Sequence, residues 1–292
     1  MSKFDPTSWL EQDENAAKLF LAPAFLLLTL FLFFPLLYLL GLSFTTGSFT
    51  QSGLQWVGLR NYVRLFTDPS FWKVLGNTVY FTVATVLPSV IIPLGLAVGL
   101  NTSLPLRGLL RTAYFIPSVT SLVAVGLGFR WLFQTEGPIN QILGIFGLEA
   151  IPWLGSPTWA MPVLILLSSW KQLGFNLVVF LAGLQTIPQS LYEAAALDGA
   201  ETWGKFWHIT LPGLRPTLIF ATVTTAIFTL RSFEQVYVIT GGGPLNSTNI
   251  LVYYIYEQAF ALFDFGYAAA AAMVLLSIAT LFIFFQLRSW AE

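Results

Sequence analysis

The chain has 292 residues, of which 56% are hydrophobic and only 9% are charged, whereas an ordinary soluble domain has about 25% charged residues. So few charges cannot cover a soluble globule of this size, which excludes a soluble enzyme. A net charge of −1 without a Lys/Arg cluster gives no basis for nucleic-acid binding. With no Cys and one His, the chain offers no disulfide, no thiol nucleophile and no His- or Cys-rich metal site. We predict no catalytic residue and no metal.

Six long apolar segments predict six membrane-spanning helices, because about 20 apolar residues in a helix cross a bilayer core of ~30 Å. The predicted spans are Leu19–Leu42, Thr78–Leu100, 112–129, Trp159–Leu184, Leu218–Ile239 and Gly266–Leu287. The first is not a cleaved signal peptide, because its apolar run is about twice the usual length and acidic residues precede it. We therefore predict an all-α integral membrane protein, with an N-terminal segment at 1–18 and a six-span core at 19–292.

The distribution of basic residues predicts the orientation, because Lys and Arg are enriched in cytoplasmic loops. With both termini inside, seven Lys and Arg residues lie in inner segments and four in outer segments. The loop at 240–265 contains no Lys or Arg, which also favours an outer position for it. We predict that both termini are cytoplasmic.

Three charged residues lie inside predicted spans. Lys171 lies about 18 Å from the outer end of the fourth span, near the membrane midplane, where a charge costs about 2.5–3.5 kcal/mol. Arg231 and Glu234 are three residues apart in the fifth span, so on a continuous helix they share a face and can pair. The two interpretations are an internal ion network and a polar wall for a hydroxyl-rich solute.

Proline and alanine mark the packing of the spans. Pro interrupts several spans, which predicts kinked helices that serve either bundle geometry or hinge motion: Pro35, Pro88, Pro93, Pro117 and Pro162. The small-residue run Ala268–Ala272 predicts close helix packing in the sixth span.

The inner loop at 185–216 predicts two short helices joined by a tight turn. Ser190 followed by Glu193 has the spacing of a capping box for the first helix, and Gly199 is suited to a left-handed turn after it. Thr202 is placed to cap the second helix, and Pro212 to end it. This predicts a helix–turn–helix hairpin on the cytoplasmic side.

The second loop helix carries large aromatic side chains at helical spacing. Trp203, Phe206 and Trp207 form one apolar face, rimmed by charged residues. Two interpretations are open, a docking surface for another protein and packing on the inner ends of the chain's own spans.

This loop resembles the EAA loop of the permeases of bacterial ABC importers. That pattern is EAA, three residues, Gly, nine residues and then Ile-x-Leu-Pro. The matching residues here are Glu193, Ala194, Ala195, Gly199, Ile209, Leu211 and Pro212. Residues 58–82, 240–244 and 254–259 are similar to the sugar-importer branch, and most like its maltose-permease type.

The resemblance implies a type I ABC importer permease fold and a set of partners. These are a second, non-identical permease subunit, two ATP-binding subunits and an extracytoplasmic solute-binding protein in the bacterial inner membrane. ATP and Mg²⁺ are expected on the ATP-binding subunits, and no cofactor in this chain. The residues expected to couple to the ATPase are Glu193, Ala194, Ala195, Asp198, Gly199, Trp203, Phe206, Ile209, Leu211 and Pro212.

The resemblance also implies inward translocation of a saccharide or sugar-like polyol by alternating access, without bond chemistry. The residues expected to contact the solute are Trp170, Lys171, Gly174, Asn176, Arg231, Ser232 and Glu234. Which solute is carried stays open: neutral disaccharides, trisaccharides and glycosylated polyols all fit, and so does glycerol phosphate, given Arg231 and Lys171.

Two other functions fit parts of the sequence. An ion-coupled secondary transporter or channel would use the intramembrane charges and broken helices, but no inverted repeat is visible. A membrane-embedded transferase would need paired acid/base groups, and only scattered carboxylates are present. Gly199–Phe206 resembles a phosphate-binding loop, but Phe206 replaces the required Ser or Thr, so we predict no nucleotide site here.

Overall fold

The structure is a computed structural model that describes residues 13–47, 53–101 and 107–291. The described residues are mostly helical, and their one sheet is the antiparallel pair β1 (Thr45–Thr46) and β2 (Gln55–Trp56). The chain divides into two compact units, residues 1–65 with 258–273 and residues 66–257 with 274–292. Each unit is described by itself.

The first unit begins with one long helical run. It consists of α2 (Asp13–Leu28), the π-helical turn η1 (Thr29–Phe33) and α3 (Phe34–Ser43). The apolar part, Ala17–Ser43, matches the first predicted span. Of the predicted segment 1–18, residues 1–12 lie outside the described residues, and α2 continues through residue 18 without a break.

Polar contacts join the remaining parts of the first unit. Helix α4 (Arg60–Thr67) begins in it, and so does α15 (Phe265–Ala291). Arg64 forms a salt bridge of 2.5 Å with Asp264, and its guanidinium lies 4.3 Å above the ring of Tyr267. The alanine run of α15 is buried from Ala268 to Ala271, as its small side chains predict.

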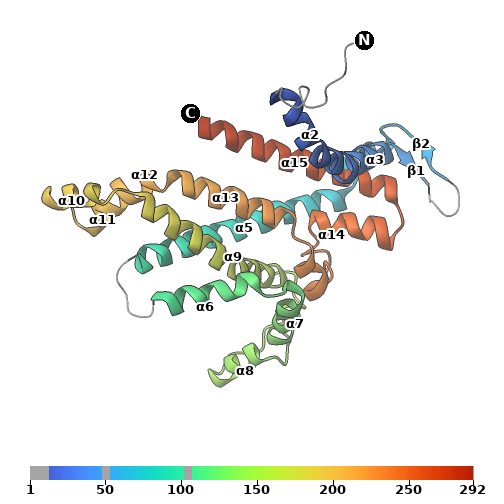
Figure 1. The fold of residues 1–292 in the computed structure, drawn as a ribbon. Helices are drawn as coiled ribbons and strands as arrows, with labels where there is room; N and C mark the ends of the chain where they lie inside the picture. Colours follow the sequence, from blue (N-terminus) through green and yellow to red (C-terminus); the bar gives the residue numbers. More distant parts are fainter. Residues whose placement is uncertain (1–12, 48–52, 102–106, 292) are drawn as a thin grey trace, which may run out of the picture. The chain divides into compact units, whose positions relative to one another are not determined.

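The second unit is built around α9. Helix α9 spans Ala160–Thr186, and the other main helices of this unit are α5 (Pro69–Leu100), α6 (Arg107–Val119), α7 (Leu122–Leu132), α8 (Pro138–Ile145) and α13 (Arg215–Leu230). Helix α9 packs against α5, α6 and α13 (Figure 1). Helices α5, α9 and α13 share an apolar cluster that includes Leu177, Phe180 and Leu214.

Short helices connect these long ones. Between α9 and α13 lie α10 (Gln189–Leu197), α11 (Thr202–Lys205), η2 (Phe206–Thr210) and α12 (Leu211–Gly213), which we call the loop helices. After α13 come η3 (Val236–Thr240), α14 (Leu251–Tyr256) and η4 (Glu257–Ala261).

Four helices of the described residues are long and apolar enough to cross a membrane. They are Ala17–Ser43, Pro69–Leu100, Ala160–Gln185 and Phe265–Phe284. Two bent pairs, α6 with α7 and α11–α12 with α13, bring the count to six if each pair is one crossing.

Two predicted spans are wrong as continuous helices. The segment at 112–129 is split into α6 and α7, which meet at an angle of 95°. The segment Leu218–Ile239 is interrupted at residues 231–233, after which helical turns resume. Hydropathy did not reveal either break, because it averages the polar residues of each break, Thr120–Ser121 and Arg231–Ser232, over the apolar residues around them.

Candidate functional site

A pocket of about 610 Å³ lies where the two broken spans meet α9. We call it the central pocket. Its polar lining consists of Ser118, Ser168, Lys171, Gln172, Thr229, Arg231, Ser232, Glu234 and Gln235, and its apolar lining of Phe115, Val119, Leu122, Phe175, Phe228 and Phe233. This volume and this mixture of aromatic and polar groups are typical of small-molecule sites.

The positions of the helix breaks explain why the pocket is polar. Val119 and Leu122 flank the first break, residues 231–233 form the second, and all of them line the pocket. At membrane depth, backbone outside a helix is tolerated only where it is buried in protein or lines a water-filled cavity. The two breaks therefore mark this pocket as a polar cavity.

Lys171 is held by the end of α6. Its Nζ donates a hydrogen bond of 2.5 Å to the carbonyl of Thr120, and Ser118 Oγ donates one to the backbone carbonyl of Lys171. Carbonyls at a helix C-terminus have no intrahelical donor and carry partial negative charge, so a cation is favourable there. This contact accounts for a charged residue in the middle of a span.

The expected pairing of Arg231 with Glu234 is wrong. Helix α13 ends at Leu230, so the three-residue spacing does not place the two side chains on one helical face. Instead, Glu234 is close enough to Lys171 to attract its ammonium group, and both residues line the central pocket.

Four of the seven predicted solute-contacting residues line the central pocket, namely Lys171, Arg231, Ser232 and Glu234. The other three do not, and each has a structural contact instead. Trp170 packs on Phe129, with ring centroids 5.8 Å apart.

Gly174 allows α9 and α6 to approach closely. A Cβ at this position would lie 2.7 Å from the Cα of Phe115 and would collide with the backbone carbonyl of Tyr114. Only glycine fits this crossing, as expected where helices in a membrane approach through small residues.

Asn176 is fully buried between α5, α9 and α13. Its side-chain amide donates to the Ser89 carbonyl at 2.6 Å and to Thr225 Oγ1 at 2.9 Å. Ser89 lies four residues before Pro93, which has no N–H, so its carbonyl lacks the usual helical donor. Asn176 therefore compensates for the proline kink in α5.

The sequence interpretation missed several residues of the central pocket. Gln172, Phe175 and Gln235 line it, and Gln235 donates to Ser168 Oγ at 3.4 Å. The residue type of a neutral side chain inside an apolar span does not indicate whether it lines a pocket. The neighbouring charges at 171 and 234 were the available indication that this depth is polar.

The loop helices contain two helical segments and a turn, in the places the sequence predicts. Gly199 adopts φ +77° in the turn, a conformation that other residues rarely adopt. Tyr192 on α10 and Thr210 on η2 share a hydrogen bond of 3.0 Å, which joins the two segments.

The predicted ends of the loop helices need correction. Helix α10 begins at Gln189 after Pro188, so Ser190 lies inside its first turn and does not cap it. Thr202 is the first residue of α11 and makes no cap hydrogen bond, since Glu201 holds the cap position. Pro212 lies within α12, which continues to Gly213.

The loop helices expose apolar side chains. Helix α10 contains no buried residue, and Leu197 at its end is 91% exposed. Trp203 is 72% exposed, and its ring meets Phe206 edge-on, as does the ring of Trp207. Such a cluster is typical of a surface that another protein covers.

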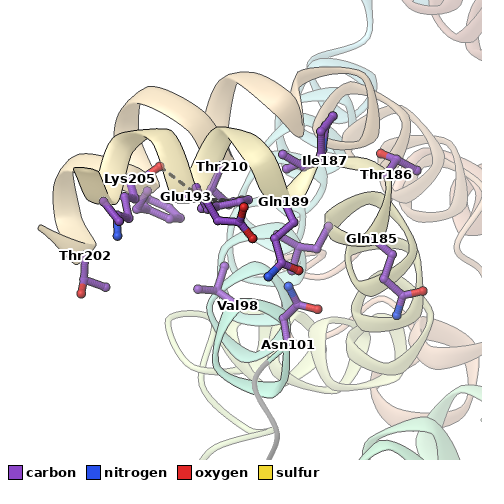
Figure 2. A pocket seen from close by; sticks show the side chains of 15 residues that line it. Val98, Asn101, Gln185, Thr186, Ile187, Gln189, Glu193, Thr202, Lys205 and Thr210 are labelled. Atoms are coloured by element: carbon purple, nitrogen blue, oxygen red, sulfur yellow. Dashed lines mark hydrogen bonds between the residues drawn. The ribbon is translucent and has the colours of Figure 1, made fainter. Parts of the chain in front are cut away.

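A second pocket, of about 870 Å³, lies between the loop helices and the ends of α5 and α9 (Figure 2). Gln189 and Glu193 line it from α10, Lys205 from α11 and Asn101 from the end of α5. The side chains of Gln189 and Asn101 point toward each other across it (Figure 2).

The loop after η3 has an unusual backbone that is held by α5. Leu245 and Asn246 have φ of +52° and +57°, and the Gly243–Pro244 peptide is cis. Lys73 donates to the Leu245 carbonyl at 2.7 Å, and Asn77 donates to the Asn246 carbonyl at 2.8 Å. Beside this loop lies a third pocket of about 460 Å³, lined by Arg130 of α7.

Tyr253 of α14 belongs to an aromatic cluster with Phe233, Tyr237 and Tyr256. Burial raises the pKa of the Tyr253 hydroxyl, and the negative charge of Glu257 raises it further. This hydroxyl therefore stays protonated, and able to donate a hydrogen bond, at neutral pH. Within the described part of the chain, no group of three His, Asp or Glu residues is placed to hold a metal ion.

Comparison with known protein families identifies what this architecture is. Residues 91–289 match the family model described as binding-protein-dependent transport system inner membrane component. The chain belongs to this family. Members are multi-pass proteins of the inner membrane, which agrees with the apolar helices described above.

Individual relatives cover nearly the whole chain. It is 42% identical to the lactose transport system permease protein LacF of Rhizobium radiobacter, over 94% of this chain and 93% of the relative. It is 40% identical to the sulfoquinovosyl glycerol transport system permease protein SmoG of Agrobacterium fabrum, over 93% and 89% respectively. The arabinooligosaccharides transport system permease protein AraP of Bacillus subtilis is 38% identical, over 90% and 84%.

Among solved structures, a chain of a bacterial ABC transporter that imports the acidic polysaccharide alginate superposes with a TM-score of 0.83. It is 26% identical in sequence, and the match covers 96% of both chains. A bacterial alginate ABC transporter in complex with an alginate pentasaccharide-bound periplasmic protein gives a TM-score of 0.82 at 25% identity, over 95% of this chain and 94% of that one. The fold is therefore that of a type I ABC importer permease.

Proposed function

We propose that this chain is the permease subunit of an ATP-driven, binding-protein-dependent importer that moves a saccharide or sugar-like polyol inward by alternating access. The central pocket carries the proposal, because it is a polar cavity bounded by two broken spans and lined by aromatic rings. The relatives whose names specify lactose, sulfoquinovosyl glycerol and arabinooligosaccharides support a sugar-like solute.

The loop helices would transmit the motion of the ATPase. Exposed Leu197, Trp203 and Trp207 would insert into a groove of an ATP-binding subunit, and Glu193 would pair with a basic residue there. Mutual packing of the aromatic rings and the Tyr192–Thr210 hydrogen bond support this role, because they would help the hairpin move as one piece. ATP and Mg²⁺ would bind on that subunit, and this chain would perform no bond chemistry.

The complete transporter would contain this chain, a second permease subunit, two ATP-binding subunits and an extracytoplasmic binding protein. Both termini would be cytoplasmic, which places the loop helices on the side of the ATPase. The solute would bind differently in outward-open and inward-open states, and ATP would change the populations of these states.

Reconstitution tests this proposal. Proteoliposomes that contain all subunits should take up the saccharide bound by the binding protein only when ATP is inside and the binding protein is outside. Glu193→Lys should reduce uptake at least tenfold and release the ATP-binding subunits during purification. As a control, Glu149→Lys reverses another exposed negative charge, in the segment between α8 and α9, and should leave the association of the ATPase unchanged. Uptake by this chain alone, independent of ATP, would overturn the proposal.

A further inference from the structure

We propose that the central pocket binds a hydroxylated solute that carries an oxyanion, such as a carboxylate, sulfonate or phosphate ester, and that Arg231 binds this group. The inference rests on the proposed function, because it names the class of solute taken by the same pocket. It starts from the charges around the pocket wall.

Three charged side chains line the central pocket, and their charges do not cancel. They are Lys171, Arg231 and Glu234, two cations and one carboxylate. Lys171 already has the Thr120 carbonyl as a partner and Glu234 as the nearby opposite charge. This leaves the guanidinium of Arg231 as an excess positive charge in the pocket.

Arg231 makes no side-chain hydrogen bond or ion pair within the described residues, and it is exposed at the break after α13. A guanidinium in a membrane-embedded cavity is costly unless a negative group or water compensates it. Its planar donors match a carboxylate, sulfonate or phosphate in two parallel hydrogen bonds. An anionic group of the solute would supply the missing partner.

The N-terminus of α7 also favours a negatively charged ligand. Leu122, its first residue, lines the central pocket, and no side chain caps this end of the helix. The free N–H groups and the helix dipole there favour negative charge. At the adjoining end of α6 the opposite partial charge is already compensated by Lys171.

The third pocket, near the C-terminal end of α7, also contains an arginine. Arg130 lies eight residues after Leu122, about 12 Å along the helix. Arg130 is the single charged residue among the described residues that line the third pocket. A solute passing from this pocket to the central one would meet one cation and then another, which raises the local concentration of anions.

The rest of the pocket fits a hydroxylated body rather than a bare anion. Gln172, Ser118 and Ser232 provide neutral donors and acceptors, and Phe175 and Phe233 provide ring faces. Sugar rings bind to this combination through their hydroxyls and their apolar C–H faces.

The test compares matched probes on the complete transporter in proteoliposomes. The acidic probes are glucuronosyl glycerol, sulfoquinovosyl glycerol and glycerol 3-phosphate; the neutral ones are glucosyl glycerol and glycerol. Calorimetry on the cognate binding protein first shows which probes are delivered. We expect an acidic probe to be bound and imported at least tenfold faster than its neutral counterpart, and the probe preferred among the three identifies the oxyanion.

Variants then assign the role to Arg231. Arg231→Gln should lower uptake of the acidic probe by about 10- to 100-fold, as expected for loss of a charge-assisted pair of hydrogen bonds. Arg231→Lys should retain more uptake than Arg231→Gln, which guards against a loss caused only by misfolding. Arg60→Gln removes an exposed arginine of α4 that lines none of the three pockets, and should leave uptake unchanged.

Import of the neutral probe at the rate of the acidic one, or uptake of the acidic probe within twofold of wild type in Arg231→Gln, would overturn this inference. ATP-dependent import of neutral sugars alone would overturn it and leave the proposed function standing. No ATP-dependent import of any saccharide or glyceride probe would overturn the proposed function itself.

Discussion

The α5–α9–α13 core and the loop helices distribute polar and apolar side chains in opposite ways. In the core, Asn176, Ser89 and Thr225 are fully buried. In the loop helices, Leu197 and Trp203 are among the most exposed side chains. In the core, the side-chain N–H groups of Asn176 donate to Ser89 and Thr225, whereas Asn176 Oδ1 and Ser89 Oγ are buried without a partner among the described residues. The exposed apolar surface of the loop helices is of the kind that another protein covers.

The comparison shows what each region depends on. The core depends on its own internal fit, through close crossings such as Gly174 and hydrogen bonds such as those of Asn176. The loop helices bury little within this chain, and under the proposed function they dock on an ATP-binding subunit. Substitutions in the core should therefore change stability, and substitutions in the loop helices should change association.

The largest effect is expected at the crossing of α6 and α9. Gly174→Ala places a Cβ against the backbone of Tyr114 and Phe115, which cannot move aside as a flexible side chain can. We expect a loss of about 3 kcal/mol of stability, measured by thermal unfolding in detergent. Gly95→Ala is the matched control, because a Cβ there meets no atom within 4 Å. Equal stability of the two variants would contradict the close crossing.

A smaller loss is expected at the kink of α5. Asn176→Leu removes the donor to the Ser89 carbonyl and to Thr225, which should cost about 2 kcal/mol. Pro93→Ala restores a backbone N–H for Ser89, so in that background the cost should fall to about 1 kcal/mol. If the cost of Asn176→Leu is the same in both backgrounds, Asn176 does not compensate for the proline.

The smallest effect on free energy is expected for the exposed surface. Trp203→Ser should leave the stability of the chain within about 0.5 kcal/mol of wild type. It should weaken binding of the ATP-binding subunit about tenfold, which corresponds to about 1.4 kcal/mol. Trp56→Ser is the matched control, since Trp56 and Trp203 are both 72% exposed. Equal binding by the two variants would show that the aromatic cluster is not the docking surface.

The sequence predicted well those features that depend on local composition. The unbroken spans at 17–43, 160–185 and 265–284 follow from hydropathy, and Gly199 follows from the need for a left-handed turn. The buried run Ala268–Ala271 follows from the size of its side chains.

The features that depend on tertiary contacts were not predictable in the same way. The breaks after Val119 and Leu230 begin at short polar segments inside otherwise apolar spans. Residues at both breaks line the central pocket, and Lys171 donates to the Thr120 carbonyl at the first. From the sequence, Asn176 was expected to contact the solute. Its actual partner, the Ser89 carbonyl left free by Pro93, lies on α5, and the sequence does not show that α5 packs there. The role of Gly174, which is to allow α6 to approach α9 closely, likewise becomes visible only when the position of α6 is known.

The most direct test of the account is a cross-link from the loop helices. The chain contains no Cys, so Trp203→Cys introduces a unique thiol on the exposed aromatic cluster. In membranes that contain all subunits, a short bifunctional reagent should join residue 203 to an ATP-binding subunit, and ATP should change the yield. Cross-links only to this chain's own helices or to lipid, with no ATP-binding subunit captured, would contradict the account.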